Sequence, residues 1–178
     1  LHPRVRRQRQ MCIRDRFNSL KKMFSGSEKE REKILAPVEG KVVPLSEVSD
    51  PTFSQEILGK GVAVIPAKGR IVAPASGVLT VMFETKHAVS VTTDGGAEII
   101  VHMGLDTVNL KGEHYTSYKK QGEHVKAGEL LLEFDIDAIK EAGYDVITPI
   151  IVCNTPNYPD MVCHTGMEVK ELDPIIEL

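Results

Sequence analysis

Residues 87–102 read His87-Ala-Val-Ser-Val-Thr-Thr-Asp-Gly-Gly-Ala-Glu-Ile-Ile-Val-His102, and this stretch decides the fold. Two strand-like runs flank Asp94-Gly95-Gly96, a turn signal typical of a β-hairpin. A hairpin would make the two runs antiparallel neighbours and bring the first and last histidines close together. Because imidazole can be a nucleophile, a proton carrier or a metal ligand near neutral pH, this pair of side chains indicates a chemical site.

The chain on either side of the hairpin, from Ile34 onward, consists of short apolar runs interrupted by Pro and Gly. This pattern predicts an all-β antiparallel sandwich or barrel with one or two short helices. We expect strands at residues 40–44, 62–66, 69–73, 77–83, 88–92, 98–102, 130–135, 147–153 and 167–171. A helix is predicted at 136–143, while residues 46–54 and 156–159 are expected to be loops. The pattern Ala-Pro-x-x-Gly occurs at 36–40 and at 73–77, which indicates that one strand-turn unit is used twice.

Charge divides the chain unevenly. Residues 1–16 contain six Arg and one Asp, a net charge of +5, whereas the whole chain carries −3 and the remainder is therefore acidic. An acidic body would repel the phosphate backbone of a nucleic acid, so we expect no nucleic-acid partner. The three cysteines include no Cys-x-x-Cys pair, which favours neither a disulfide framework nor a zinc ribbon.

The first 33 residues differ from the body, and we expect residues 34–178 to form the folded domain. Residues 1–16 are interpreted as a basic disordered tail and 25–33 as a solvated linker. Between them Phe17, Leu20 and Phe24 share one face of a short helix, which is either a frayed leader or a weak contact with a membrane surface. No signal peptide or membrane-spanning run is recognised, so we expect a cytoplasmic protein, with peripheral contact at the inner membrane face as an option.

The best candidate site residues are His102 and His87, with Thr85 and Asp106 as supporting groups. Thr85 lies two residues before His87 and is therefore expected on the same strand face, and Asp106 follows His102 after a glycine that lets the chain turn back. A hydroxyl or carboxylate beside an imidazole fixes its tautomer and leaves the other nitrogen free to attack. The alternative for Asp106 is that it only caps the turn at Thr107. The other histidines, at 2, 114, 124 and 164, are expected to be structural or exposed.

Two motifs closely resemble enzyme IIA of the glucose family in the bacterial sugar phosphotransferase system. They are His-Ala-Val-Ser-Val from His87 and Val-His-Met-Gly-Leu-Asp-Thr-Val-Asn-Leu-Lys-Gly from Val101, and the resemblance extends from about Ile34 to the C-terminus. It implies the antiparallel β-sandwich of the duplicated hybrid type. It also implies that His102 accepts a phosphoryl group from phospho-HPr and passes it to a sugar-specific enzyme IIB, with His87 stabilising the phosphate. No metal or cofactor is implied.

Further roles are expected at such a site. Thr85 would position His87 or bridge to the phosphate. From its charge, and not from the resemblance, we infer that Asp106 would repel the bound phosphoryl group or contact a basic partner. A site of this family also needs an apolar collar that docks partner proteins and excludes water. The candidates for this collar are Phe53, Ile57, Phe83, Ile100 and Met103.

Two other functions remain open. A zinc peptidase of related sandwich architecture could use His87, His102 and Asp106 as three metal ligands, although the His-x-His pair typical of that class is absent. A regulatory binding module that never turns over phosphate is the second alternative.

Overall fold

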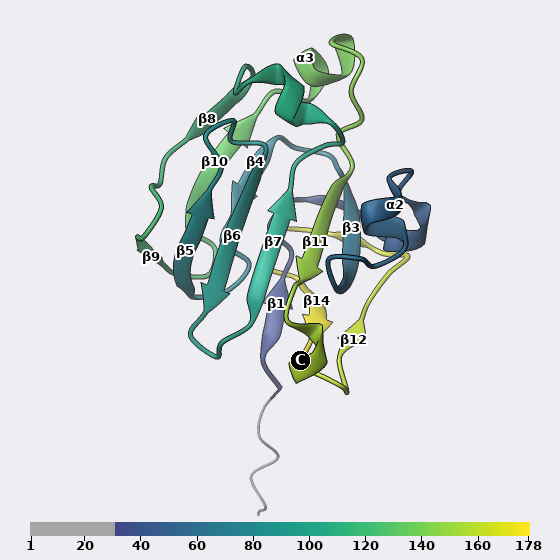
Figure 1. Ribbon diagram of the computed structural model, residues 1–178, viewed down its shortest axis with the longest axis vertical. Coiled ribbons are helices and arrows are strands. Elements are labelled where there is room, and N and C mark those ends of the chain that lie inside the picture. Colours follow the sequence, from purple (N-terminus) through teal and green to yellow (C-terminus); the bar gives the residue numbers. More distant parts are fainter. Residues whose placement is uncertain (1–30) are drawn as a thin grey trace, which may run out of the picture. The chain divides into compact units, whose positions relative to one another are not determined.

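The computed structural model in Figure 1 describes residues 31–178, and Glu32–Leu178 form one compact unit. The predicted basic tail, the Phe17–Phe24 leader and its expected membrane contact lie outside the described residues. Within residues 31–178, no helix is both long enough and apolar enough to cross a membrane.

Antiparallel strands are the main regular elements of this unit and the helices are short, so the predicted all-β class is confirmed. The strands are β1 (Lys33–Leu35), β2 (Gly40–Pro44), β3 (Lys60–Pro66), β4 (Arg70–Val72), β5 (Gly77–Met82), β6 (Ala88–Thr93), β7 (Glu98–His102), β8 (Tyr115–Ser117), β9 (His124–Val125), β10 (Leu130–Phe134), β11 (Thr148–Val152), β12 (Val162–Cys163), β13 (Glu168–Val169) and β14 (Pro174–Glu177). The helices are α2 (Pro51–Ser54) and α3 (Ile136–Glu141), and the 3₁₀ turns are η1 (Leu45–Glu47), η2 (Thr107–Leu110) and η3 (Thr155–Asn157).

The strands form one large sheet and two small ones. The large sheet has eight strands in the order β13-β2-β3-β11-β7-β6-β5-β9, and the small sheets are β1-β14-β12 and β4-β10-β8. In Figure 1 the strands β4 and β10 lie behind β5 and β6. Fully buried side chains such as Leu79, Val91 and Val101 of the large sheet share one core with Ile71 and Leu132 of a small sheet. This layered core is that of a sandwich.

The predicted hairpin is present and pairs β6 with β7 along their whole length. The register runs from Ala88 opposite His102 to Thr92 opposite Glu98. At the turn, the Thr93 hydroxyl accepts a hydrogen bond from the Ala97 amide at 3.0 Å, and Gly96 has a φ of +93°, which L side chains rarely adopt. The turn residues thus fix the register that places both histidines at the same end.

The two Ala-Pro units pack against each other reciprocally. The Leu35 amide donates to the Pro74 carbonyl at 2.8 Å, and the Val72 amide donates to the Pro37 carbonyl at the same distance. Equivalent positions in the two copies therefore exchange equivalent bonds. The duplication inferred from the sequence is a structural one.

Residues 46–54 were expected to be a plain loop, and this prediction is wrong because the segment contains α2. Pro51 begins the helix, and the Asp50 side chain caps it by accepting a bond from the Thr52 amide at 2.8 Å. Apolar side chains of this segment, including Leu45, Val48 and Phe53, pack on the outer face of the large sheet against Ile151. A second small core therefore covers the part of this face that adjoins His102.

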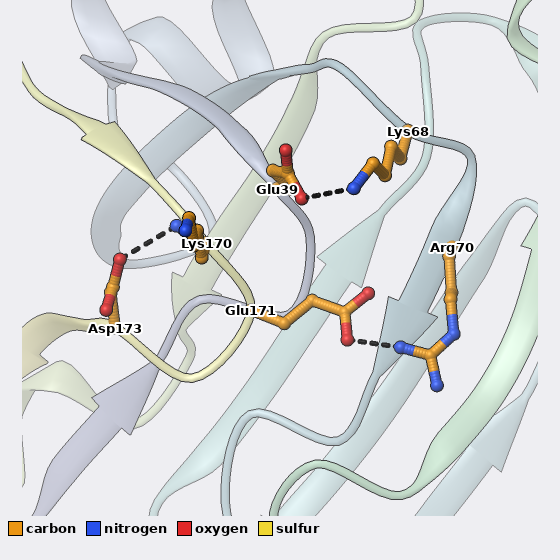
Figure 2. Close-up of polar contacts among 6 residues, drawn as sticks. All are labelled: Glu39, Lys68, Arg70, Lys170, Glu171 and Asp173. Carbon is orange, nitrogen blue, oxygen red and sulfur yellow. Dashed lines mark hydrogen bonds and ion pairs between the residues drawn. The ribbon is translucent and has the colours of Figure 1, made fainter.

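Another side of the molecule carries paired charges, which we call the charged edge: Glu39, Lys68, Arg70 and Glu171 (Figure 2). Lys68 contacts Glu39 at 2.7 Å, and Arg70 forms an ion pair with Glu171. The first pair links the β1–β2 connection to the β3–β4 connection, and the second links β4 to the turn after β13. The same turn is closed by the Lys170 amide, which donates to the Asp173 carboxylate at 2.8 Å.

Candidate functional site

The structure brings His87 and His102 together, as the hairpin predicts. His102 is the last residue of β7, and His87 immediately precedes β6. Their ring centroids are 5.0 Å apart and the ring planes meet at 80°, so one ring presents its edge to the face of the other. The Met103 amide donates to the His87 carbonyl at 2.7 Å and ties the two segments together directly beyond the strand ends.

The ring of His102 is held by a single backbone acceptor. Its Nδ1 lies 2.8 Å from the Gly104 carbonyl oxygen. Because a carbonyl can only accept, Nδ1 must carry the hydrogen, and the lone pair of the neutral ring is then on Nε2. Gly104 can turn its carbonyl toward the ring because it has a φ of +83°, a conformation that a residue with a Cβ rarely adopts.

His87 is held by Thr85, whose Oγ1 lies 2.5 Å from the His87 Nδ1. The sequence argument placed both residues on one strand face, but they lie in the turn between β5 and β6. Lys86, between them, adopts a φ of +55°, which folds the turn and brings the hydroxyl onto the ring. The predicted pairing is therefore present, although the turn and not strand periodicity creates it.

Both imidazoles are shifted toward the neutral form. Burial, and to a smaller extent the neighbouring His102, lowers the pKa of His87 to about 4. Burial also lowers the pKa of His102, while the bond to Gly104 and the charges of Asp50 and Asp106 act in the opposite direction. A histidine whose pKa is lowered in this way stays in its neutral form at neutral pH. Each ring therefore keeps one nitrogen with a free lone pair.

The predicted apolar collar is only partly present at the surface. Phe83 is 41% exposed and its ring lies 5.2 Å from that of His87, while Ile57 is 66% exposed beyond α2. Ile100 is half-buried and points to the same face of β7 as His102. These three side chains remain candidates for contact with a partner.

Two collar residues need correction. Met103 is fully buried, because the chain turns inward after His102 and places this side chain in the main core. Phe53 is only 4% exposed, yet its ring lies 5.1 Å from that of His102. Phe53 is therefore a wall behind the imidazole and offers little surface to a docking protein.

Asp106 lies beside the site in an acidic hollow that the sequence argument did not predict. The hollow has a volume of about 570 Å³ and is lined by Asp50, Asp106 and Asp145 among others. Asp106 makes no side-chain capping bond to η2, so the interpretation of Asp106 as a turn cap is wrong. Asp50 and Asp145 went unnoticed because their carboxylates bond locally to the Thr52 and Ile147 amides, a pattern that looks like ordinary turn chemistry in sequence.

The peptidase alternative requires at least three clustered metal-binding side chains. Across residues 31–178, His, Cys, Asp and Glu side chains form no group of three that could hold a metal ion. His87, His102 and Asp106 therefore do not form the ligand set which that alternative assigned to them.

Known proteins resemble this chain in sequence and in structure. The glucose-specific EIIA component of Oceanobacillus iheyensis is 47% identical over 139 residues, which is 77% of this chain and 84% of that protein. The β-glucoside-specific EIIBCA component of Bacillus subtilis is 51% identical over 128 residues, 72% of this chain. The chain spans only 21% and 23% of the length of the two β-glucoside-specific relatives from B. subtilis and Halalkalibacterium halodurans.

Among solved structures, glucose permease IIA from Mycoplasma capricolum superimposes with a TM-score of 0.77 at 36% identity. The match covers 83% of this chain and 95% of that one. The family described as phosphoenolpyruvate-dependent sugar phosphotransferase system, EIIA 1, matches residues 32–158 and so includes both histidines. The chain therefore belongs to the EIIA 1 family of the phosphoenolpyruvate-dependent sugar phosphotransferase system.

Proposed function

We propose that the chain is a phosphocarrier in sugar uptake. His102 accepts a phosphoryl group from the phosphohistidine of HPr and passes it to a cysteine of an enzyme IIB. The observation that carries this proposal is the bond from His102 Nδ1 to the Gly104 carbonyl, which leaves Nε2 as the nucleophilic nitrogen. The family assignment supports the choice of donor and acceptor proteins.

Phosphoryl transfer requires few catalytic groups from this chain. As the donor P–N bond breaks, a P–N bond forms to His102 Nε2, and the proton on Nδ1 stays in its bond to Gly104. The phosphoramidate is already reactive, so the site mainly aligns the groups and stabilises charge on the equatorial oxygens. When the Thr85 hydroxyl donates to Nδ1 of His87, the His87 proton is on Nε2 and is available to a phosphoryl oxygen.

The acidic hollow is consistent with a phosphocarrier, which must release the phosphoryl group as well as accept it. The carboxylates of Asp50 and Asp106 lie near enough to His102 to influence its pKa. Their charge repels a bound phosphoryl group and so limits the stability of the phosphorylated state. The same charges attract basic groups on a visiting protein, which gives Asp106 a part in docking.

The docking face combines these charges with exposed apolar side chains. Phe83 and Ile57 remain exposed although both are large and hydrophobic, and Ile100 adds apolar surface next to His102. Contact through such side chains excludes water from a labile phosphoramidate during transfer.

Incubation with phosphorylated HPr tests the proposal. Wild-type chain should take up label, and His102→Gln should take up none. His124→Gln is a matched control, because His124 is exposed and bonds Asp94 away from the site. Uptake by the His102 variant at the wild-type rate would contradict the proposal. Failure of wild type to accept label from phospho-HPr would favour a regulatory module without turnover.

A further inference from the structure

Two buried hydroxyl groups donate hydrogen bonds to the backbone carbonyl of Met103, the residue after His102. Tyr115 begins β8, is only 5% exposed, and donates from its phenol oxygen to the Met103 carbonyl at 2.9 Å. The Thr107 hydroxyl donates to the same carbonyl at 2.8 Å. One backbone oxygen therefore uses both lone pairs on side chains that reach it from different segments.

This carbonyl belongs to the turn that holds both histidines. The Met103 carbonyl is part of the Met103–Gly104 peptide group. The next carbonyl, that of Gly104, accepts the His102 Nδ1 hydrogen. The amide of the same residue, Met103, donates to the His87 carbonyl at 2.7 Å. Rotation of the Met103–Gly104 peptide would therefore move the acceptor that fixes the tautomer of His102.

Local sequence does not hold this turn rigidly by itself. Gly104 has a φ of +83° and no side chain to restrict it. A Cβ at this position would lie 2.6 Å from the Asp145 carbonyl oxygen and 2.6 Å from Thr107 Cγ2, so a stiffer residue does not fit there. The restraint must come from hydrogen bonds made by residues outside the turn.

We propose that Tyr115 is a positioning residue for phosphoryl transfer: its hydroxyl fixes the Met103–Gly104 peptide and thereby keeps the His102 ring in the tautomer with a free Nε2. The proposal rests on the assignment of His102 as the phosphoryl acceptor. Tyr115 itself contacts neither the imidazole nor a partner, because its ring stacks on Phe134 inside the core, with centroids 6.1 Å apart.

Tyr115→Phe removes this bond with little other disturbance. The aromatic ring and its stacking on Phe134 remain, and Thr107 still donates to the Met103 carbonyl, so no buried acceptor is left without a partner. Burial raises the pKa of Tyr115, so the wild-type phenol keeps the proton that it donates. Tyr118→Phe is a matched control, because Tyr118 follows the same strand but is 51% exposed and bonds Glu133.

The test measures transfer from phospho-HPr and, separately, the tautomer of His102 by ¹⁵N NMR of the unphosphorylated chain. For Tyr115→Phe we expect the maximal transfer rate to fall roughly five- to tenfold, as for loss of one hydrogen bond, with KM for phospho-HPr unchanged. The population of His102 with hydrogen on Nδ1 should fall as well. Tyr118→Phe should match wild type in all three measurements.

An unchanged His102 tautomer in Tyr115→Phe would overturn the positioning role, whatever happens to the rate. A rise in KM with an unchanged maximal rate would also overturn it, because that result indicates altered docking. The NMR measurement needs no phosphoryl transfer. If wild type accepts no phosphoryl group, the proposed function is wrong. The NMR measurement still shows whether Tyr115 controls the tautomer of His102.

Discussion

The histidine site and the charged edge both gather ionisable side chains, but they treat charge in opposite ways. At the charged edge, Lys68 is largely exposed and Arg70 is partly exposed, and the hydrogen bonds that they donate to Glu39 and Glu171 raise the pKa of each cation. At the histidine site, burial lowers the pKa of both imidazoles, and among residues 31–178 no carboxylate forms a hydrogen bond with either ring. The first arrangement keeps groups charged and satisfied, whereas the second keeps them neutral and reactive.

This difference predicts where substitutions have large effects. Exposed ion pairs contribute little to stability, because water screens them and long side chains lose entropy when they pair. A buried imidazole with one nitrogen bonded and one nitrogen free has no equivalent replacement among other side chains. Changes at the histidine site should therefore alter chemistry strongly, and changes at the charged edge should alter little.

His87→Gln should give the largest effect, a loss of onward phosphoryl transfer, and should leave the charged edge unchanged. We expect the variant still to accept label on His102 but to pass it to enzyme IIB on the order of 10²–10³ times more slowly, because the imidazole N–H that Thr85 positions for the phosphoryl group is lost. Single-turnover assays of uptake and onward transfer would separate the two steps. Equal slowing of both steps would mean that His87 mainly holds the structure.

Phe53→Ala should give the next largest effect, on folding. Removing a ring that is only 4% exposed and packs against His102 should lower the free energy of unfolding by roughly 3 kcal/mol. Urea denaturation would measure the loss. Phe83→Ala is the control, because Phe83 is 41% exposed and should cost clearly less than the buried ring. Similar losses for both would contradict the assignment of Phe53 as a wall of the site.

Acid should destabilise the histidine site specifically. Burial lowers the pKa of His87 from 6.5 to about 4, so the unfolded chain binds this proton at a higher pH than the folded one. The stability that results is present above pH 6.5 and is lost as the pH falls toward 4, by about 2 kcal/mol at pH 5. Urea midpoints between pH 7.5 and pH 4.5 should fall less steeply for His87→Gln than for wild type. Parallel curves would show that His87 is not the group responsible.

Arg70→Gln should give the smallest effect. The Arg70 and Glu171 side chains are 41% and 25% exposed, so we expect a loss of less than about 1 kcal/mol in the free energy of unfolding. Phosphoryl uptake from HPr should stay at the wild-type rate. A large loss of uptake would show that the charged edge influences the histidine site, against this prediction.

Those features of the fold and of the histidine site that depend on local sequence patterns were predicted from the sequence. Asp94-Gly95-Gly96 predicted the hairpin, and hence the meeting of His87 and His102, because turn residues fix strand register. The helix predicted at residues 136–143 is also present as α3. The Thr85–His87 contact was predicted for an inadequate reason, since the turn geometry at Lys86 produces it.

Tertiary features were harder to predict. Met103 looks like surface because it follows the reactive histidine, but the turn at Gly104 carries it into the core. The short strands β1, β8, β9, β12 and β14 lack enough residues to show a period, so partners distant in sequence define them. The acidic hollow combines Asp50, Asp106 and Asp145 from three separate segments, which no local pattern reveals.

The most direct test of the central claim is the NMR spectrum of ¹⁵N-histidine-labelled chain after phosphorylation by phospho-HPr. We expect a single phosphohistidine, His102, with phosphorus bonded to Nε2 and hydrogen retained on Nδ1. Phosphorus on His87, or on Nδ1 of His102, would contradict it.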